Sequence, residues 1–428
     1  MKPSFTKTKN FCAIAFILFS TIACNAQTTI KTGGAQNTTV DYKKLANIDT
    51  LVNGYVNRNW IKGVVTIVVK DGQVVQNKAY GFSDAESKKP METNSIFRIA
   101  SQTKAIVSTG ILILYDEGKL SLSDPVSKYI PEFAHEKVLD SFHPSDTTYT
   151  TVPAKRDITI KDLLTHTSGL DYPGIGTDNM KAIYAKNDIQ SGLGVVNESL
   201  LDAMKRLGKL PLSFQPGTQW RYGLSVDVLG AVIEVVSGMS LEDFLRKNIL
   251  EPLNMNDTWF NLPANESNRL TAVYTEDSLH NIIRWNKTNF GVDPDYPKIS
   301  KQYFSGGAGL SSTAYDYAVF LQMIMNGGTY NGKTILSERT TEMMLHPQLD
   351  FLFNGKNNFG LGFEIVTDKG SADGSRNAGS FDWGGYFGTT YWADPKEHLV
   401  CLIMTQQTPN SHYQLSQQFE QLVYASLK

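Results

Sequence analysis

Hydrophobic residues near the two ends of the chain follow strand and helix periods that predict a shared sheet. Residues 42–56 (YKKLANIDTLVNGYV) place apolar side chains at helical spacing. Residues 63–82 (GVVTIVVKDGQVVQNKAYGF) hold two β-branched runs on either side of Asp71-Gly72, which predicts a β-hairpin. Strand patterns return late in FGLGFEIV, YFGTTYWADP and HLVCLIMT, and a last helical pattern covers residues 413–427.

The middle of the chain, about residues 120–300, has a different pattern. Helical stretches such as DVLGAVIEVVSG and LEDFLRKNI alternate with loops rich in Pro, Gly, Asn and Asp. The hairpin and the late strands are each too small to form a useful sheet alone. We therefore expect an α+β fold with one antiparallel sheet, built from about 40–120 and 300–428 and flanked by the N- and C-terminal helices. The middle would be an inserted helical subdomain within a single domain over 40–428.

Composition and charge narrow the function classes. The chain has 428 residues, of which 41% are hydrophobic, and this suits a globular protein with a large core. Its formal net charge is -2, and the body contains no basic block, so we expect no nucleic-acid partner. Cys401 lies in the apolar run HLVCLIMT and is expected to be buried and inert.

The first 26 residues have the pattern of a secretory signal peptide: a basic start, an apolar stretch and the small-residue exit CNAQ. Cleavage after Ala26 would release the protein, whereas cleavage before Cys24 would leave a cysteine for lipid attachment. Thr21 fits the usual lipoprotein pattern poorly, which favours release. Residues 27–39 are polar and are expected to form a flexible leader. We therefore expect an exported protein, periplasmic or secreted, with a membrane contact only through a lipid at Cys24.

Ser101 and Lys104 are the first candidates for chemistry. They lie three residues apart at the start of a helix predicted from Ser101 to Glu117, and such residues share a helix face. A serine becomes a nucleophile only when its proton is removed, and lysine can accept it only if its pKa is lowered. The apolar flanks FRIA and AIVSTGILIL could favour the neutral amine. A structural alternative stays open, because Ser-x-x-Lys is a weak motif: Ser101 as a helix cap beside a solvated Lys104.

Other hydrolase patterns do not occur in the sequence. It contains no Gly-x-Ser-x-Gly, no His-Glu-x-x-His, and neither a phosphate loop nor a dinucleotide fingerprint. The seven histidines are scattered. We therefore expect neither a metal nor a cofactor.

Seven blocks, in order between about residues 63 and 405, resemble the serine β-lactamase and penicillin-binding superfamily. The match is to its class C-like branch, which includes D-amino-acid peptidases and β-lactamase-related esterases. The resemblance implies a β-lactamase/transpeptidase-like fold and a serine that is acylated. The blocks are FRIASQTKAIV, LSLSDPVSKYIPEF, ITIKDLLTHTSGL, FQPGTQWRYGLSVDVLGAVIEVVSG, LEPLNMNDTWF, SGGAGLSSTAYDYAVFLQMIMNGG and FDWGGYFGTTYWADP.

The resemblance assigns roles motif by motif. Ser101 would be the nucleophile and Lys104 would help to deprotonate it. Tyr222, which opens YGLS, would shuttle protons, as a phenol beside a positive charge can. The N–H groups of Ser101 and Tyr386 would bind the oxyanion. His166, in LLTHTSGL, would have a structural role, and SGGAGL at 305–310 would form a backbone turn near the cleft.

Two departures from the family pattern concern the substrate. Trp383, Gly384 and Gly385 occupy the usual Lys-Thr-Gly strand, so a charge-assisted contact to a substrate carboxylate is lost. Glycines inside a strand often mark a close approach of ligand or backbone, although a bulge or bend of the sheet is the local alternative. Leu224 takes the place of the asparagine of Tyr-x-Asn, and Ser225 is the candidate to replace its contact. The Trp-Gly-Gly form resembles the esterase-like branch and implies an uncharged ester or amide.

These observations predict an exported serine hydrolase that acts through an acyl-enzyme on Ser101. An esterase, amidase or peptidase of small acyl compounds is the first expectation. A β-lactamase or D-alanyl-D-alanine carboxypeptidase is the second. A protein of the same fold that binds or senses its ligand without turnover is an alternative of another class.

Overall fold

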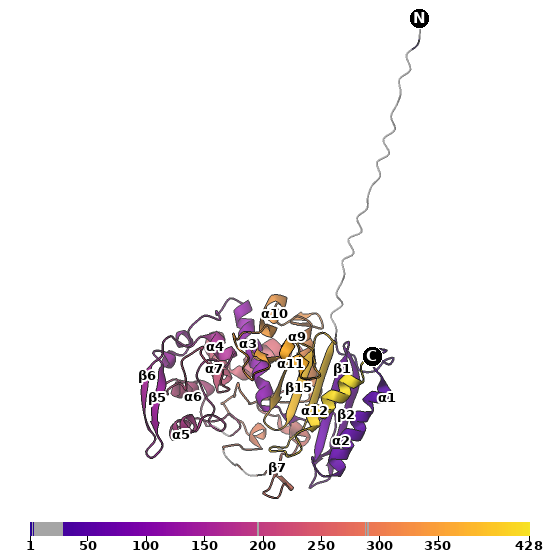
Figure 1. Cartoon of the computed structure of the whole chain (residues 1–428), viewed down its shortest axis with the longest axis horizontal. Coiled ribbons are helices and arrows are strands. Elements are labelled where there is room, and N and C mark those ends of the chain that lie inside the picture. Colours follow the sequence, from indigo (N-terminus) through magenta and orange to yellow (C-terminus); the bar gives the residue numbers. More distant parts are fainter. Residues whose placement is uncertain (2, 4–28, 195–196, 287, 289–290) are drawn as a thin grey trace.

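The computed structural model describes residues 1, 3, 29–194, 197–286, 288 and 291–428. The predicted signal peptide therefore lies outside the described residues, apart from its first and third residues. An eight-stranded antiparallel sheet occupies the centre of the domain (Figure 1). In sheet order its strands are β12 (Asn358–Phe359), β13 (Glu364–Ile365), β14 (Phe381–Gly385), β15 (Thr389–Asp394), β16 (Leu399–Met404), β1 (Gly63–Lys70), β2 (Gln73–Asp84) and β3 (Lys89–Pro90).

The pairing of β1 with β16 joins the two ends of the chain in one sheet. Val65 lies opposite Met404, and the register continues along both strands. The β1–β2 hairpin turns at Asp71 and Gly72, whose φ angles of 53° and 71° are those a tight two-residue turn requires. The predicted sheet and hairpin are therefore confirmed.

Two separate cores cover the faces of the sheet. Val64 and Val68 of β1 face the core of the terminal helices, whereas Val65 and Ile67 face the larger core. The first face is covered by α1 (Tyr42–Leu45), α2 (Asn47–Asn57) and α12 (Leu415–Ala425), as Figure 1 shows. On the other face, α9 (Ala314–Met325) packs on β1 and β16, and α3 (Thr103–Asp116) packs on the subdomain helix α7 (Ser225–Ser237).

The subdomain between α3 and α9 contains strands as well as the expected helices. Its hairpins are β5 (Lys137–His143) with β6 (Thr148–Pro153), and β7 (Tyr274–Glu276) with β8 (Ile282–Arg284). The expected helical subdomain therefore also contains two hairpins that were not predicted. Most residues of β6 are exposed, so no apolar alternation marked it in the sequence. The helices are α4 (Ile160–Leu164), α5 (Asp178–Lys186), α6 (Leu200–Leu207), α7 and α8 (Leu241–Leu245), which continues into one π-helical turn.

Short elements complete the domain around the sheet. The strand pairs are β4 (Phe97–Arg98) with β9 (Ser311–Ser312), and β10 (Thr329–Tyr330) with β11 (Lys333–Thr334). The remaining helices are α10 (Glu338–Leu345) and α11 (Asp368–Ala372). Among the helices of the described ranges, none has both the length and the hydrophobicity to cross a bilayer.

The described part of the predicted leader contacts the domain. Ile30 is buried, and its N–H donates to the Tyr330 hydroxyl at 3.1 Å. Lys31 forms a parallel bridge with Gln73 at the start of β2. These contacts attach this part of the segment to the sheet. Cys401, predicted to be buried, is a fully buried free thiol.

Candidate active site

Ser101 lies in a 3-10 turn, η1 (Ala100–Gln102), directly before α3. Ala100 has a φ of 43°, in the left-handed region that residues other than glycine adopt rarely and mainly where the surroundings enforce it. The N-cap of α3 is Gln102, which makes no capping hydrogen bond through its side chain. The capping alternative for Ser101 is therefore wrong. Its side chain lines a cavity instead.

Lys104 is buried beside Ser101. Its side chain is 3% exposed, and its Nζ lies 3.4 Å from Ser101 Oγ. The same Nζ donates to the backbone carbonyl of Gly307 at 2.7 Å, and that carbonyl fixes the direction of the amine. The alternative of a solvated lysine is therefore wrong as well, and the predicted Ser–Lys pair is present in the structure.

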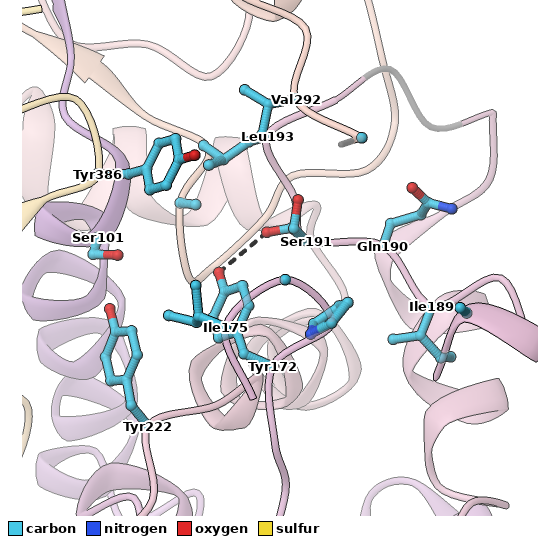
Figure 2. A pocket seen from close by; sticks show the side chains of 15 residues that line it. Ser101, Tyr172, Ile175, Ile189, Gln190, Ser191, Leu193, Tyr222, Val292 and Tyr386 are labelled. Carbon is cyan, nitrogen blue, oxygen red and sulfur yellow. Dashed lines mark hydrogen bonds between the residues drawn. The ribbon is translucent and has the colours of Figure 1, made fainter. Parts of the chain in front are cut away.

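Two tyrosines enclose the lysine. Lys104 Nζ lies 4.5 Å from the ring centroid of Tyr222 and 5.4 Å from that of Tyr172. The two rings are stacked, with centroids 5.8 Å apart and an interplanar angle of 10°. An ammonium ion over an aromatic ring is attracted by the electron-rich face. Figure 2 shows the hydroxyl of Tyr222 directed toward Ser101, so the phenol lies beside the Ser–Lys pair.

Strand β14 passes close to the turn that carries Ser101. A Cβ atom at Gly385 would overlap the carbonyl oxygen of Ile99 and the side chain of Thr389, so only glycine fits there. The close approach of backbone predicted for this pair is thus present at Gly385. Trp383 lies two residues earlier, and its Nε1 donates to the Tyr222 hydroxyl at 3.4 Å. Gly384 lies between Trp383 and Gly385. A Cβ atom added at Gly384 would have more room than one at Gly385, since its nearest atom would be 3.2 Å away.

A cavity of about 340 Å³ opens at Ser101 (Figure 2). Among its fifteen lining residues, all of them described, none carries a formal charge. Tyr172 and Tyr222 form one side, and Tyr386, which is 42% exposed, forms another. The aliphatic part of the lining consists of Ile175, Ala185, Ile189, Leu193, Val292 and Ala308. The cavity therefore suits an uncharged, largely apolar group attached to a carbonyl at Ser101.

Ser225 is placed away from this cavity. It is fully buried as the first residue of α7, and its hydroxyl shares a 2.9 Å hydrogen bond with the hydroxyl of Ser168. The expected substrate contact by Ser225 is therefore corrected, because its side chain points into the protein interior. Leu224 is also fully buried.

His166 is packed among aromatic rings. Its ring centroid lies 5.0 Å from that of Tyr222 and 5.8 Å from that of Trp220. Burial, together with the positive charge of Lys104, lowers the pKa of His166 well below 6.5. The imidazole is therefore neutral at pH 7. This arrangement fits the structural role predicted for it.

Two residues of the site, Tyr172 and Asp227, were missed in the sequence, whereas Gly307 belongs to the segment SGGAGL that was expected near the cleft. Tyr172 lies in the loop DYPG, where turn residues hide any periodic signal. Asp227 and Gly307 lie near Lys104 but belong to other segments. No local spacing could have shown that these residues meet. Among the described residues, no group of three or more His, Cys, Asp or Glu side chains could hold a metal ion.

Comparisons with known proteins agree with this fold. A family model described as Beta-lactamase matches residues 48–424. Protein Rv1367c of Mycobacterium tuberculosis is 32% identical over 364 residues, covering 82% of this chain and 87% of the relative. Esterase EstB of Burkholderia gladioli is 29% identical over 380 residues, covering 84% of this chain and 90% of the relative. The solved structure of "EstCE1, a hydrolase with promiscuous acyltransferase activity" has a TM-score of 0.77 at 24% identity, covering 89% of this chain and 99% of that chain.

These likenesses extend over nearly the whole described domain and include both the sheet and the inserted subdomain. They confirm the expected α+β fold of the β-lactamase/transpeptidase type. The chain belongs to the β-lactamase family and is a serine hydrolase.

Proposed function

We propose that the protein is an esterase of small, uncharged acyl compounds that acts through an acyl-enzyme on Ser101. The observation that supports this most is the Ser101–Lys104 pair, 3.4 Å apart, at the opening of a cavity without charged lining residues. Amides of the same acyl groups are the next candidates, because the same steps would cleave them.

In the proposed reaction, Ser101 Oγ attacks the carbonyl carbon while its proton passes to the Lys104–Tyr222 pair. The N–H groups of Ser101 and Tyr386 would stabilise the negative charge that develops on the carbonyl oxygen. The alcohol leaves with the proton returned by the same pair, and the acyl group stays on Ser101. A water molecule then attacks the carbonyl carbon of the acyl-enzyme. Its proton follows the same route to Ser101 Oγ, and the carboxylic acid is released.

The choice of an uncharged substrate rests on charge complementarity. β-Lactams and stem peptides carry a carboxylate near the bond that is cut, and a cation at the third motif would pair with it. Here Trp383 occupies that position, and its indole bonds to Tyr222. Two proteins similar to this chain also bear names that describe an esterase and a hydrolase with acyltransferase activity, which supports the proposal.

The test combines hydrolysis of a short-chain nitrophenyl ester with intact-protein mass after incubation with a penicillin, for wild type and Ser101→Ala. We expect ester turnover that is lost in the variant and no stable penicilloyl adduct. A serine-dependent adduct or rapid β-lactam cleavage would favour a β-lactamase or carboxypeptidase instead. A burst of one equivalent of product followed by arrest would indicate a binding or sensor protein, and wild type inert toward both probes would refute Ser101 as a general nucleophile.

We also propose export, because the leader has a basic start, an apolar stretch and a small-residue exit. The mass of the mature protein from the native host would test this. A chain beginning at Gln27 supports release, and a diacylated Cys24 supports a lipid anchor. The full-length chain in the cytosol would contradict export.

A further inference from the structure

A buried carboxylate lies next to the candidate site and has no part in the steps above. Asp227 is fully buried in the first turn of α7, five residues after Tyr222. Its Oδ1 accepts a 2.6 Å hydrogen bond from Ser305 Oγ, while its Oδ2 lacks a hydrogen bond of good geometry among the described residues. Burying a carboxylate is costly unless hydrogen bonds or an opposite charge compensate it, and the backbone N–H of Gly307 supplies one such interaction.

The position of Gly307 shows that Lys104 is the opposite charge near Asp227. A Cβ atom at Gly307 would overlap Asp227 Oδ2 and would lie 3.3 Å from Lys104 Nζ. The carboxylate and the amine therefore flank the same small space, which only a glycine leaves open. The Gly307 carbonyl already accepts the hydrogen bond from Lys104, so one residue both orients the amine and admits the carboxylate beside it.

The charges around this space are few. Burial raises the pKa of Asp227, while the Ser305 hydrogen bond, the positive charge of Lys104 and backbone hydrogen bonds from Gly307 and Asp227 act in the opposite direction. The charges of Asp227 or Lys104 act on the pKa values of Tyr172, Tyr303 and His166, and the ring of Tyr222 lies 4.5 Å from Lys104 Nζ. Burial lowers the pKa of His166 and raises the pKa values of Tyr172 and Tyr303, so none of these three side chains adds a charge beside Asp227 and Lys104 at pH 7.

We infer that Asp227 is the counter-charge of Lys104 and a positioning residue for the proposed reaction. It holds the amine between Gly307 and Ser101 and balances its positive charge. The inference rests on the proposed function, since it concerns the pair that would activate Ser101. Asp227 acts through Lys104 and does not itself line the described cavity.

A direction follows from the sign of the charge. A carboxylate favours the protonated form of a neighbouring base, so its removal favours the deprotonated form. The limb of the pH profile of kcat/KM that reports the group accepting the Ser101 proton should therefore move to lower pH. A residue that only supports the fold would change stability without moving that limb.

The experiment compares wild type with Asp227→Asn, which keeps the shape and removes the charge, using nitrophenyl ester hydrolysis between pH 5 and 10. We expect kcat on the pH plateau to fall about tenfold or more with KM little changed, because the amine is no longer held toward Ser101. The limb should move down by about one pH unit or more. Ser305→Ala should have the same effects to a smaller degree, because it removes the hydroxyl that stabilises the carboxylate. This second variant also serves if Asp227→Asn folds poorly.

Asp316→Asn is the matched control. Asp316 is likewise a buried carboxylate in the first turn of a helix, α9. It accepts hydrogen bonds from Asp257 N at 2.8 Å and Thr258 Oγ1 at 3.0 Å. We expect it to lower stability and to leave the pH profile in place. If Asp227→Asn behaves like Asp316→Asn, or moves the limb to higher pH, the inference is wrong. If Ser101→Ala retains full activity, the proposed function itself fails, and this outcome is separate from the other two.

Discussion

Lys104 and Lys301 are both buried, and each contacts a backbone carbonyl and a tyrosine ring, but their amines differ in the other groups that they contact. Lys104 is 3% exposed and Lys301 is 6% exposed. Each donates to a backbone carbonyl, Lys104 to Gly307 at 2.7 Å and Lys301 to Phe260 at 2.8 Å. Each also lies near a tyrosine ring, Lys104 4.5 Å from the centroid of Tyr222 and Lys301 5.3 Å from that of Tyr296.

The difference lies in what else the two amines reach. Lys104 reaches a serine hydroxyl at the edge of a cavity, whereas Lys301 Nζ also contacts the Tyr296 carbonyl at 3.2 Å and the Asn261 amide oxygen at 3.3 Å. Carbonyl and amide oxygens can accept hydrogen bonds but cannot become nucleophiles. Burial of a lysine therefore does not make a site by itself. A hydroxyl within reach and an opening for substrate are also needed.

The largest expected difference comes from replacing each lysine by methionine. Lys104→Met should reduce ester hydrolysis by about a thousandfold, since it removes a group expected to carry the serine proton. Lys301→Met should keep the activity of the folded enzyme but lower the free energy of unfolding by about 3 kcal/mol, because buried carbonyls lose their donor. Kinetics and denaturant unfolding of both variants would measure this. Equal loss of activity in the two would remove the distinction.

The pH dependence of stability sharpens the same comparison. Burial lowers the pKa of Lys301 to about 8 from its usual 10.5. Between these values the unfolded chain binds more protons at this group, so its contribution to stability is complete above pH 10.5 and is lost as the pH falls to 8. Wild type should therefore gain about 3 kcal/mol relative to Lys301→Met from pH 8 to 10.5. A parallel pH dependence of the two unfolding curves would contradict this.

The two tyrosines beside Lys104 provide the next contrast. Tyr222→Phe should lower kcat about a hundredfold, because the hydroxyl directed toward Ser101 is lost. Tyr172→Phe loses a hydrogen bond to the Ser191 carbonyl instead, so it should change kcat by less than about tenfold. Steady-state kinetics on the same ester would separate them. Similar losses in both would mean that stacking, rather than the Tyr222 hydroxyl, matters.

The smallest difference between two compared variants is expected at the two glycines of β14. Gly385→Ala should reduce activity by tens of fold, roughly the cost of shifting the Ser101 turn away from the new methyl group. Gly384→Ala meets its nearest atom at 3.2 Å and should cost only a few-fold, on the order of 1 kcal/mol. Comparison of kcat/KM for the two variants, with circular dichroism to verify the fold, provides the measurement. A larger loss at Gly384 would contradict the assigned close approach.

Much of the fold followed from local patterns. The terminal helices, the Asp71-Gly72 hairpin and the late strands match α2, β1–β2, β15, β16 and α12. The exposed strand β6 was missed because a strand without a buried face shows no alternation. In the site, the Ser101–Lys104 spacing was readable because residues three apart on a helix meet without tertiary help.

The sequence by itself determined the elements with a buried face, the pairing of Ser101 with Lys104, and the family pattern that contains Tyr222. Only the tertiary structure decided that Ser225 points inward, that Tyr172 stacks on Tyr222, and that Gly385 admits the turn before Ser101. It also placed Gly307, 203 residues from Lys104, between this amine and Asp227. The physical reason is range: helix and strand periods act between neighbours in the chain. Contacts between distant segments depend on how whole elements pack, and a single sequence leaves no periodic trace of them.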